Sequence, residues 1–367
     1  MARRTVPNRR DEIIAGSITD VAGLGLGHFH RRSASWRTGT TVVVAPEGAV
    51  AGVDVRGGGP GTRETDLLRP ENLVSQVHAI CLTGGSAFGL AAADGVMSEL
   101  ERRRIGFRVG TASDLVVPIV PAAVIFDLGR AGHAEHRPDR DFGIRATRSA
   151  LARTSTARTR QIAVVEGALG AGTGARAGGL QGGVGMASRV VDLRAVGDAS
   201  APASTVVAAL AVVNAVGSAI DPRTASPWEP TGSLRSPSAA DRRRFADHLA
   251  SLEVRRHPPL NTTIGVVATD LALTKAECTK VAGVAHDGLA RAIRPAHSMH
   301  DGDTIFTLAT GGLPPEARSG SWPLVMNLVL QAAAEVFAQA CTRAVVEARH
   351  VGGPPSYRDL CPSAFIR

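Results

Sequence analysis

An asparagine and two threonines stand where a polar part of the chain meets an apolar run, in the sequence NTTIGVVATD that begins at Asn261. As the start of a strand the two threonines are ordinary, because threonine is β-branched and favours strands. Thr262 gains a chemical use if the chain is cut before it. The freed α-amine, with a pKa of roughly 7.7–8.0, can take the proton of the hydroxyl in the same residue and make that hydroxyl a nucleophile.

The Thr262 hydroxyl could also make that cut. Its attack on the carbonyl of Asn261 would shift the acyl group from nitrogen to oxygen, and water would then split the ester. Residues 219–260 precede this bond and are rich in proline, serine and arginine. We therefore expect residues 219–260 to be an exposed linker in front of the candidate cleavage site. On the residue pattern alone, the structural and the chemical interpretation of Thr262 both stay open.

Two glycine-rich stretches suggest other kinds of site. Residues 54–68 contain GGGPG, but no lysine occurs in the stretch, so the Gly-Lys-Ser/Thr pattern of a phosphate loop is absent. A close backbone crossing near a site is the favoured interpretation there, since glycine allows close approach. Residues 82–90, LTGGSAFGL, miss the Gly-x-Ser-x-Gly pattern of a nucleophile elbow by one residue. Gly84, Gly85 and Ser86 are expected to form a strand-to-helix turn whose serine caps the helix or helps to hold an oxyanion.

Histidine and cysteine patterns carry no metal or disulfide signature. Histidines pair closely at residues 28–30, 133–136 and 297–300, yet none of these pairs has the HExxH spacing that places two ligands on one helix face. The four cysteines lie far apart and include no CxxC pair. We expect surface or hydrogen-bonding histidines, and a site without a metal or another cofactor.

Composition excludes several classes of partner. The formal charge is 41 − 33 = +8, but the basic residues are almost all arginines and are scattered, and aromatic residues make up only 4%. Stacking platforms for bases are therefore scarce, and we expect no nucleic-acid partner. No apolar run reaches the roughly 18 residues of a membrane span, and the basic N-terminal residues lack an apolar run behind them. The expected location is cytoplasmic, with no membrane contact.

Apolar periodicity places the candidate residues on alternating strands and helices. Strands are expected at residues 40–48, 49–55, 77–85, 107–110, 117–128, 204–218, 263–270 and 304–311, and helices at 86–104, 142–155, 238–253, 274–293 and 321–350. Residues 262–367 alone offer about two strands, which is too few for a sheet with two covered faces. We therefore predict one α/β domain over residues 17–367, after a flexible tail at residues 1–16.

Long stretches of the chain resemble a known family. They are ITDVAGLGLGH (18–28), GTTVVVAPEGAVAGVDVRGGGPGTRETDLL (39–68), VHAICLTGGSAFGLAAADGVMSELE (77–101), VPIVPAAVIFDL (117–128), GAGTGARAGGLQGGVGMAS (170–188), VVNAVG (212–217), NTTIGVVATD (261–270) and AHDGLARAIRPAHSMHDGDTIFTLATG (285–311). In these stretches the sequence is similar to the DmpA-type self-processing aminopeptidases, whose relatives include nylon-oligomer hydrolases and β-peptidyl aminopeptidases. The resemblance implies a four-layer αββα sandwich, like that of the N-terminal-nucleophile hydrolases but with different connectivity, and a homo-oligomer, with a tetramer the expected state.

The same resemblance implies roles for particular residues. Thr262 stands where the family nucleophile becomes the N-terminus of a small subunit, residues 262–367, and Asn261 ends a large subunit, residues 1–261. Asn214 matches an asparagine that helps to hold the oxyanion. Asp301 and Asp303 match acidic positions near the nucleophile, where carboxylates can accept from the α-ammonium and orient it.

One position departs from the family pattern. A lysine that touches the nucleophile usually precedes GGxGxAS, and Gln181 stands there in this chain. Glutamine can form hydrogen bonds but brings neither a charge nor a base. The leading hypothesis is a self-processing amide hydrolase of the aminopeptidase type that forms an acyl-enzyme on Thr262. The alternatives are an acyltransferase on the same fold and a non-catalytic relative in which Gln181 marks lost activity.

Overall fold

The computed structural model describes residues 16–110, 115–154, 165–197, 202–232, 234–252, 261–312 and 319–365. The strands are β1 Gly25–Arg32, β2 Arg37–Val55, β3 Thr62–Arg63, β4 Gln76–Thr83, β5 Phe107–Arg108, β6 Val116–Val117, β7 Ala122–Val124, β8 Arg176–Ala177, β9 Leu180–Gln181, β10 Gly183–Asp192, β11 Ser204–Asn214, β12 Thr262–Thr269 and β13 Thr304–Ala309. The α-helices are α1 Ala91–Glu101, α2 Arg140–Leu151, α3 Ala239–Ala250, α4 Lys275–Ala292, α5 Trp322–Val346 and α6 Tyr357–Leu360.

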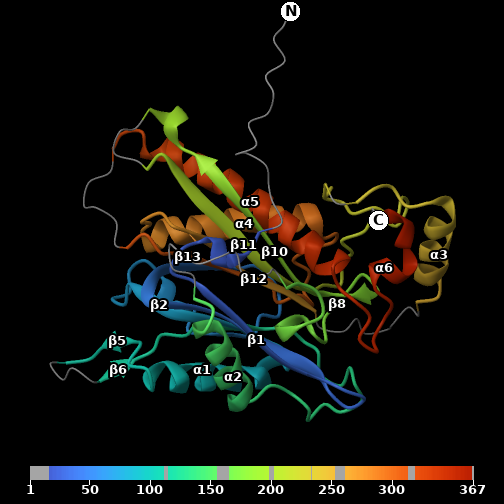
Figure 1. The fold of residues 1–367 in the computed structure, drawn as a ribbon, viewed down its shortest axis with the longest axis horizontal. Coiled ribbons are helices and arrows are strands. Elements are labelled where there is room, and N and C mark those ends of the chain that lie inside the picture. Colours follow the sequence, from blue (N-terminus) through green and yellow to red (C-terminus); the bar gives the residue numbers. More distant parts are fainter. Residues whose placement is uncertain are drawn as a thin grey trace, which may run out of the picture.

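The long strand β2 joins two halves of one sheet. The sheet has nine strands in the order β10-β11-β12-β13-β2-β4-β7-β3, with β1 also paired to β2. The first part of β2, up to Val44, pairs with β1 and β4, and the part from Val50 pairs with β13, with a register shift between Val44 and Ala49. Such a shift bends the strand. The two halves of the sheet lie over each other in Figure 1, with α1 and α2 outside one half and α4 and α5 outside the other.

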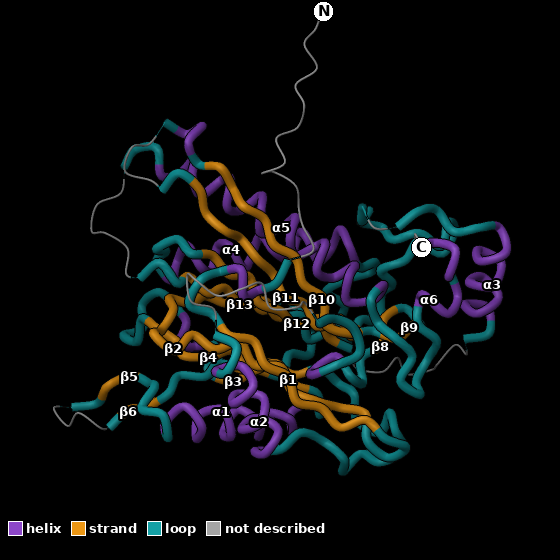
Figure 2. Tube along the Cα trace, in the orientation of Figure 1, coloured by secondary structure: helices purple, strands orange, loops and turns teal. Residues whose placement is uncertain are grey.

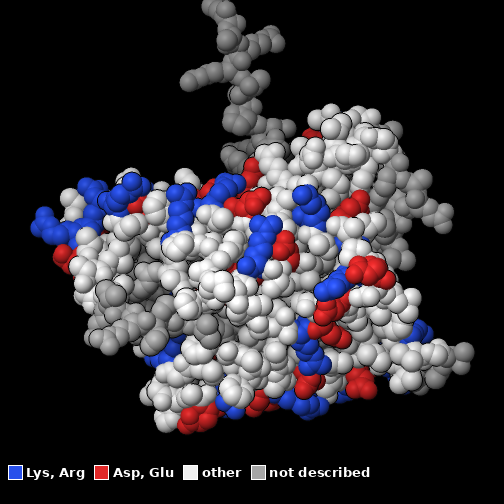
Figure 3. Space-filling model, turned by 180° about the vertical axis from the view of Figure 1, so that it is seen from behind, with Lys and Arg blue, Asp and Glu red and all other residues white. Residues whose placement is uncertain are grey.

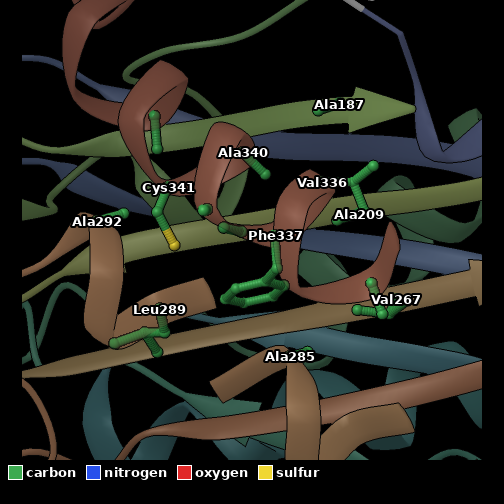
Figure 4. Packing of buried hydrophobic residues seen from close by; sticks show 14 of the residues in the cluster. Ala187, Ala209, Val267, Ala285, Leu289, Ala292, Val336, Phe337, Ala340 and Cys341 are labelled. Carbon is green, nitrogen blue, oxygen red and sulfur yellow. The ribbon is translucent and has the colours of Figure 1, made fainter. Parts of the chain in front are cut away.

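Three separate hydrophobic clusters fill the spaces between these four layers. One cluster joins the β1/β2/β4 half to α1 and α2 and includes Val42 and Val96. A second lies between the two halves and includes Val43 and Ile264. The third, part of which Figure 4 shows, packs α4 and α5 on the β10–β13 half around Phe337. This arrangement confirms the predicted αββα sandwich, with the refinement that β2 makes the two sheets continuous.

Strand alternation decides which way each side chain of β12 points. Ile264 and the other even-numbered apolar residues of β12 belong to the cluster between the sheet halves. Val267 belongs to the cluster under the helices, and a Cβ at Gly265 would lie 2.5 Å from the Phe337 ring. Because successive side chains alternate across a strand, Thr262 points between the sheets and Thr263 points toward α4 and α5.

The register of the neighbouring strands defines what surrounds the start of β12. Antiparallel pairing with β11 puts Asn214 opposite Thr262. Pairing with β13 is parallel, with Ile264 opposite Thr304, so the residues that precede β13 lie beside the residues that precede β12. Figure 2 shows these strands side by side. Residues far apart in the sequence therefore meet at the Asn261–Thr262 peptide bond.

The segment expected to be an exposed linker is different in the structure. Ile220 and Phe245 are fully buried, and α3 packs with α6 at one end of the molecule. The apolar positions Ile220 and Phe245 are far apart among polar residues, which is why the composition suggested a linker. The correction applies to residues 219–232 and 234–252, while residues 253–260 lie outside the described residues, as does almost all of the expected tail 1–16.

Five strands were not among the expected elements: the longer β1 and β10 and the two-residue strands β3, β8 and β9. β10 lies in the stretch 161–190, where many glycines lowered its strand signal. Its glycines are needed for packing: a Cβ at Gly185 would collide with the backbone of α5 at Ala340 and Ala344. Glycine in this strand thus allows a helix to approach closely.

Helix α5 is the element to compare with the expectation of no membrane contact. Among the described residues, α5 is the one helix long and apolar enough to cross a membrane, and 61% of its most apolar window is buried inside the structure. Its contacts with α4, β10 and β11 make it a core helix of the sandwich.

Figure 3 shows basic and acidic side chains side by side over much of one face, which fits the interpretation of the arginine surplus as a compositional feature.

Candidate active site

The Asn261–Thr262 peptide bond lies at the start of β12 and is buried. Asn261 and Thr262 are each only 5% exposed. The Thr262 hydroxyl donates a hydrogen bond to the carbonyl oxygen of Asn261, the residue just before it. Thr263 has no such contact: its hydroxyl is buried on the other face of the strand, and no described residue is its hydrogen-bond partner. The geometry therefore distinguishes the two threonines and brings the Thr262 hydroxyl next to the carbonyl it would attack.

The loop before β13 holds this peptide bond from the other side. Asn261 N–H donates to the carbonyl oxygen of His300 at 2.9 Å, and Gly302 N–H donates to the carbonyl oxygen of Asn261 at 3.1 Å. A Cβ at Gly302 would lie 2.9 Å from Thr262 Oγ1 and 2.8 Å from Gly59 O. Residue 302 must therefore be glycine for its N–H to reach the Asn261 carbonyl without displacing the hydroxyl. A backbone N–H aimed at a carbonyl oxygen is the element from which oxyanion holes are built.

The glycine-rich stretch 54–68 supports that loop. Gly59 N–H donates to Asp301 O at 2.8 Å, and Gly57 N–H donates to Asp303 O at 3.3 Å. A Cβ at Gly57 would collide with the backbone of Asp301 and Asp303. The glycines make a close backbone crossing beside the candidate site.

The two predicted carboxylates have different surroundings. Asp303 is fully engaged: one oxygen accepts from Thr263 N–H at 2.7 Å, and the other accepts from His297, through its N–H at 3.0 Å and its Nδ1 at 2.8 Å. Asp301 uses one oxygen to accept from the N–H and hydroxyl of Ser298, at 2.9 and 2.6 Å. Its other oxygen, Oδ1, is buried and has no partner among the described residues. Asp303 thus fixes the start of β12, while Asp301 keeps a free acceptor.

Asn214 lies opposite Thr262 with both ends of its amide in use. Its Oδ1 accepts from Arg176 N–H at 3.1 Å and from the Arg130 guanidinium. Its Nδ2 donates to Phe126 O at 3.3 Å, which leaves the second N–H of the amide for another acceptor. The structure therefore places the predicted oxyanion donor at the site, held by partners that the sequence did not reveal.

Gln181 is buried in β9, but its side chain is tied to the backbone. The amide nitrogen donates to Ala175 O at 2.8 Å and Gly182 O at 3.0 Å. The hydrogen bonds of Gln181 thus hold the chain between β8 and β10 and do not reach Thr262.

Gly84, Gly85 and Ser86 form the expected tight turn between β4 and α1. Gly85 and Ser86 have φ of 86° and 52°, and a short 3-10 helix runs from Ser86 to Leu90. Its N-cap is Gly85 and has no side-chain cap bond, so the expected capping by Ser86 is wrong. Gly85 N–H donates to Asp127 Oδ1 at 2.7 Å, and Ser86 N–H donates to Ile125 O at 3.0 Å. The hydrogen bonds of the turn therefore anchor the loop that follows β7, which is the loop that carries Arg130.

Asp127 is the carboxyl of that loop, and burial raises its pKa to about 6. An unfolded aspartate has a pKa near 3.9, so the folded chain binds more protons between about pH 4 and pH 6. The burial cost of the charge is absent at low pH and complete above pH 6. The turn and the loop are thus joined through a carboxyl that is costly to ionise.

We expect Asp127→Asn to change the pH dependence of stability. Relative to the variant, the wild-type free energy of unfolding should fall as pH rises from about 4 to about 6, and the variant should be more stable by about 1–3 kcal/mol at pH 8. Urea unfolding of both proteins from pH 4 to 8 measures the difference. Two curves that run parallel over this range would contradict the argument.

The three histidine pairs of the sequence lie in different surroundings in the structure. His297 of the 297–300 pair belongs to the site, because it holds Asp303. His28 is half-buried and bonded to Thr41 Oγ1 at 2.9 Å, and desolvation of its ring lowers its pKa to about 3. The ligand atoms of His133, Glu135 and His136 lie within 4.8 Å of one another near the surface. Contacts within the protein engage all three: His133 pairs with Glu135 at 3.1 Å, and His136 Nδ1 lies 2.7 Å from the backbone carbonyl oxygen of Ser35.

The fold is a variant of the N-terminal-nucleophile hydrolase fold. A solved L-aminopeptidase D-Ala-esterase/amidase from Ochrobactrum anthropi, described as a new variant of that fold, superposes with a TM-score of 0.66 at 21% identity, over 93% of this chain and 90% of the other. A β-aminopeptidase of Burkholderia sp. superposes with a TM-score of 0.63 at 23% identity, over 98% of both chains.

The chain belongs to peptidase family S58, whose model matches residues 16–357. An uncharacterized aminopeptidase of Mycobacterium tuberculosis is 47% identical over 366 residues, which cover 95% of this chain and 99% of the relative. A 6-aminohexanoate-oligomer endohydrolase of Kocuria sp. is 29% identical over 90% of this chain and 84% of its own length. The protein is therefore a hydrolase of the peptidase and amidohydrolase class, with aminopeptidases among its relatives.

Proposed function

We propose that the protein is a self-processing hydrolase whose nucleophile is Thr262, exposed as an N-terminus by scission of the Asn261–Thr262 bond. One observation carries the proposal. The carbonyl of Asn261 lies between the hydroxyl of Thr262, which would attack it, and the N–H of Gly302, which would stabilise the negative oxygen. Family membership supports it, since the chain is a peptidase with an N-terminal-nucleophile type of sandwich.

The proposed cut proceeds in two balanced steps. In the first, Thr262 Oγ1 forms a bond to the carbonyl carbon of Asn261, the C–N bond breaks, and the hydroxyl proton goes to the leaving nitrogen. In the second, water attacks the resulting ester. The products are a carboxylate on Asn261 and a free hydroxyl and α-amine on Thr262.

The mature site would then treat a substrate amide in the same way. The α-amine takes the proton of the Thr262 hydroxyl, the oxygen attacks the substrate carbonyl, and an acyl-enzyme forms that water resolves. The free Oδ1 of Asp301 is the acceptor that would orient the α-ammonium. The N–H of Gly302 and the second N–H of the Asn214 amide are the available oxyanion donors.

The proposed substrates are small peptides or amides that carry a free N-terminal amine. Asp301 and Asp303 bring negative charge to the site, which suits a substrate ammonium. The names of the relatives support amide substrates, from aminopeptidases to a 6-aminohexanoate-oligomer endohydrolase. Assembly into a homo-oligomer and a cytoplasmic location stay predictions.

Intact mass and N-terminal sequencing of the purified protein test the proposal. We expect two fragments, residues 1–261 and 262–367, the second beginning Thr-Thr-Ile-Gly. The cleaved protein should hydrolyse an aminoacyl p-nitroanilide. A folded chain that stays at full length through long incubation would overturn the proposal, and a fragment that begins at Thr263 would move the nucleophile by one residue.

A further inference from the structure

The proposed chemistry needs a positive charge that Gln181 does not provide. During self-cleavage negative charge develops on the carbonyl oxygen of Asn261, and a nearby cation lowers the energy of that state. The amide of Gln181 is neutral and is bonded to backbone carbonyls. If the reaction occurs, other groups around Asn261 must favour the charge.

Arg130 brings a guanidinium to the cleavage site from a distant part of the chain. Its Nη1 donates to Asn214 Oδ1 and, at 2.5 Å, to Gly174 O. Its Nη2 lies 3.5 Å from Asn261 Oδ1. One planar cation therefore contacts the residue opposite Thr262 in the strand pair and the residue on the other side of the bond to be cut.

The loop that carries Arg130 is held at several points. Arg37 Nη1 donates to Arg130 O at 3.0 Å, and Arg130 N–H donates to Asp127 O at 3.4 Å. Asp127 is in turn bonded to Gly85 in the turn between β4 and α1. These contacts fix the guanidinium before any substrate binds, and a charge that is fixed in advance is more effective than one that must reorganise.

We propose that Arg130 is the positioning cation of self-cleavage, taking the place of the family's lysine from another part of the fold. The inference rests on the proposed function. Its guanidinium holds the Asn214 and Asn261 side chains in place and favours the oxyanion at the Asn261 carbonyl. By withdrawing charge from Asn214 Oδ1 it also strengthens the amide N–H of Asn214 as a donor. Arginine stays protonated, so Arg130 acts by charge and geometry and not as a base.

Time courses of freshly synthesised chains test this role. Each variant is made by cell-free translation, and loss of the full-length band is followed on denaturing gels. We expect Arg130→Gln to slow cleavage by on the order of 10²-fold. Arg130→Lys keeps the charge but loses the planar guanidinium with its several N–H donors, and it should slow cleavage by about tenfold. Adding Gln181→Lys to Arg130→Gln should restore at least tenfold. Arg145→Gln is the matched control, since Arg145 is an exposed arginine of α2 that pairs with Asp141.

The pH profile of the matured enzyme gives a second readout that loss of folding would not mimic. A cation near the Thr262 α-amine lowers the pKa of its ammonium, so Arg130→Gln should move the acid limb of kcat/KM upward by about half a unit to one unit. The carboxylate of Asp301 opposes this effect, and the other titratable groups around it are Asp303, whose oxygens are engaged by Thr263 and His297, together with His297 and Asp127. Arg130→Lys should keep the wild-type limb.

The outcomes separate this inference from the proposed function. If the wild-type chain folds and is never cut, the proposed function fails. If Arg130→Gln is cut as fast as wild type and has an unshifted pH limb, only the role of Arg130 fails. Should Arg130→Gln not fold, Arg130→Lys decides: cleavage about tenfold slower than wild type supports the role, and cleavage as fast as wild type overturns it.

Discussion

Replacing Thr262 by alanine should leave the chain at full length, because the hydroxyl beside the Asn261 carbonyl is lost. Amide hydrolysis should fall by on the order of 10⁴-fold or more, since neither the nucleophile nor its own amine is then formed. Denaturing gels and a p-nitroanilide assay measure the two effects. Thr262→Ser, which keeps a hydroxyl at this position, should still be cut.

Thr263→Val is the matched control for this variant. It removes a hydroxyl from the next residue without changing its shape, and that hydroxyl is buried with no partner in the part of the chain that the structure describes. Removing an unpartnered buried hydroxyl is neutral or stabilising, so we expect cleavage within about threefold of wild type and equal or higher stability. Cleavage that is lost in Thr263→Val and kept in Thr262→Ala would show that the assignment is off by one residue.

Local patterns in the sequence were sufficient for the longer strands and the helices, whereas the order of the four layers came from the family resemblance. Alternation and helical spacing predicted β4, β12, β13 and the long helices, because these elements bury apolar faces with a regular period. The turn at Gly84–Ser86 could be predicted from its two glycines. A residue with a Cβ is unfavourable there, because the position needs a positive φ or lies too close to its neighbours. The failures, β10 and the packed segment around Phe245, lie where glycine or polar residues mask a short apolar pattern.

Only some residues of the candidate site could be predicted from the sequence, for a different reason. Thr262, Asn214 and the two aspartates stand in long family-like stretches, so resemblance found them. Gly302, Ser298 and His297 act through contacts whose meaning depends on the parallel register of β12 and β13. Arg130 is invisible to any local pattern, because its contact with Asn214 arises only where the loop between β7 and α2 packs against the end of β11. Contacts between distant segments follow from the fold, and sequence spacing does not encode them.

Exchanging each aspartate for asparagine separates the two carboxylates. Asp301→Asn keeps an acceptor for Ser298 but points an amide, in place of a carboxylate oxygen, at the position of the α-ammonium. We expect kcat/KM to fall by about 10²–10³-fold. The acid limb of its pH profile should move downward by about one unit, because the lost negative charge had raised the pKa of the ammonium. This shift is opposite in sign to that expected for Arg130→Gln.

Asp303→Asn should act mainly on the fold of the site. Asp303 accepts from Thr263 N–H and twice from His297, and asparagine cannot replace all three bonds. His297 has a φ of 57°, a left-handed conformation that is unfavourable for a side chain with a Cβ, so its contacts with Asp303 must offset that cost. We expect a loss of about 1–3 kcal/mol of stability in urea unfolding, with little shift of the pH limb. Equal pH shifts and equal stability losses in both variants would mean that the free oxygen of Asp301 has no special role, and that the two carboxylates act as one structural unit.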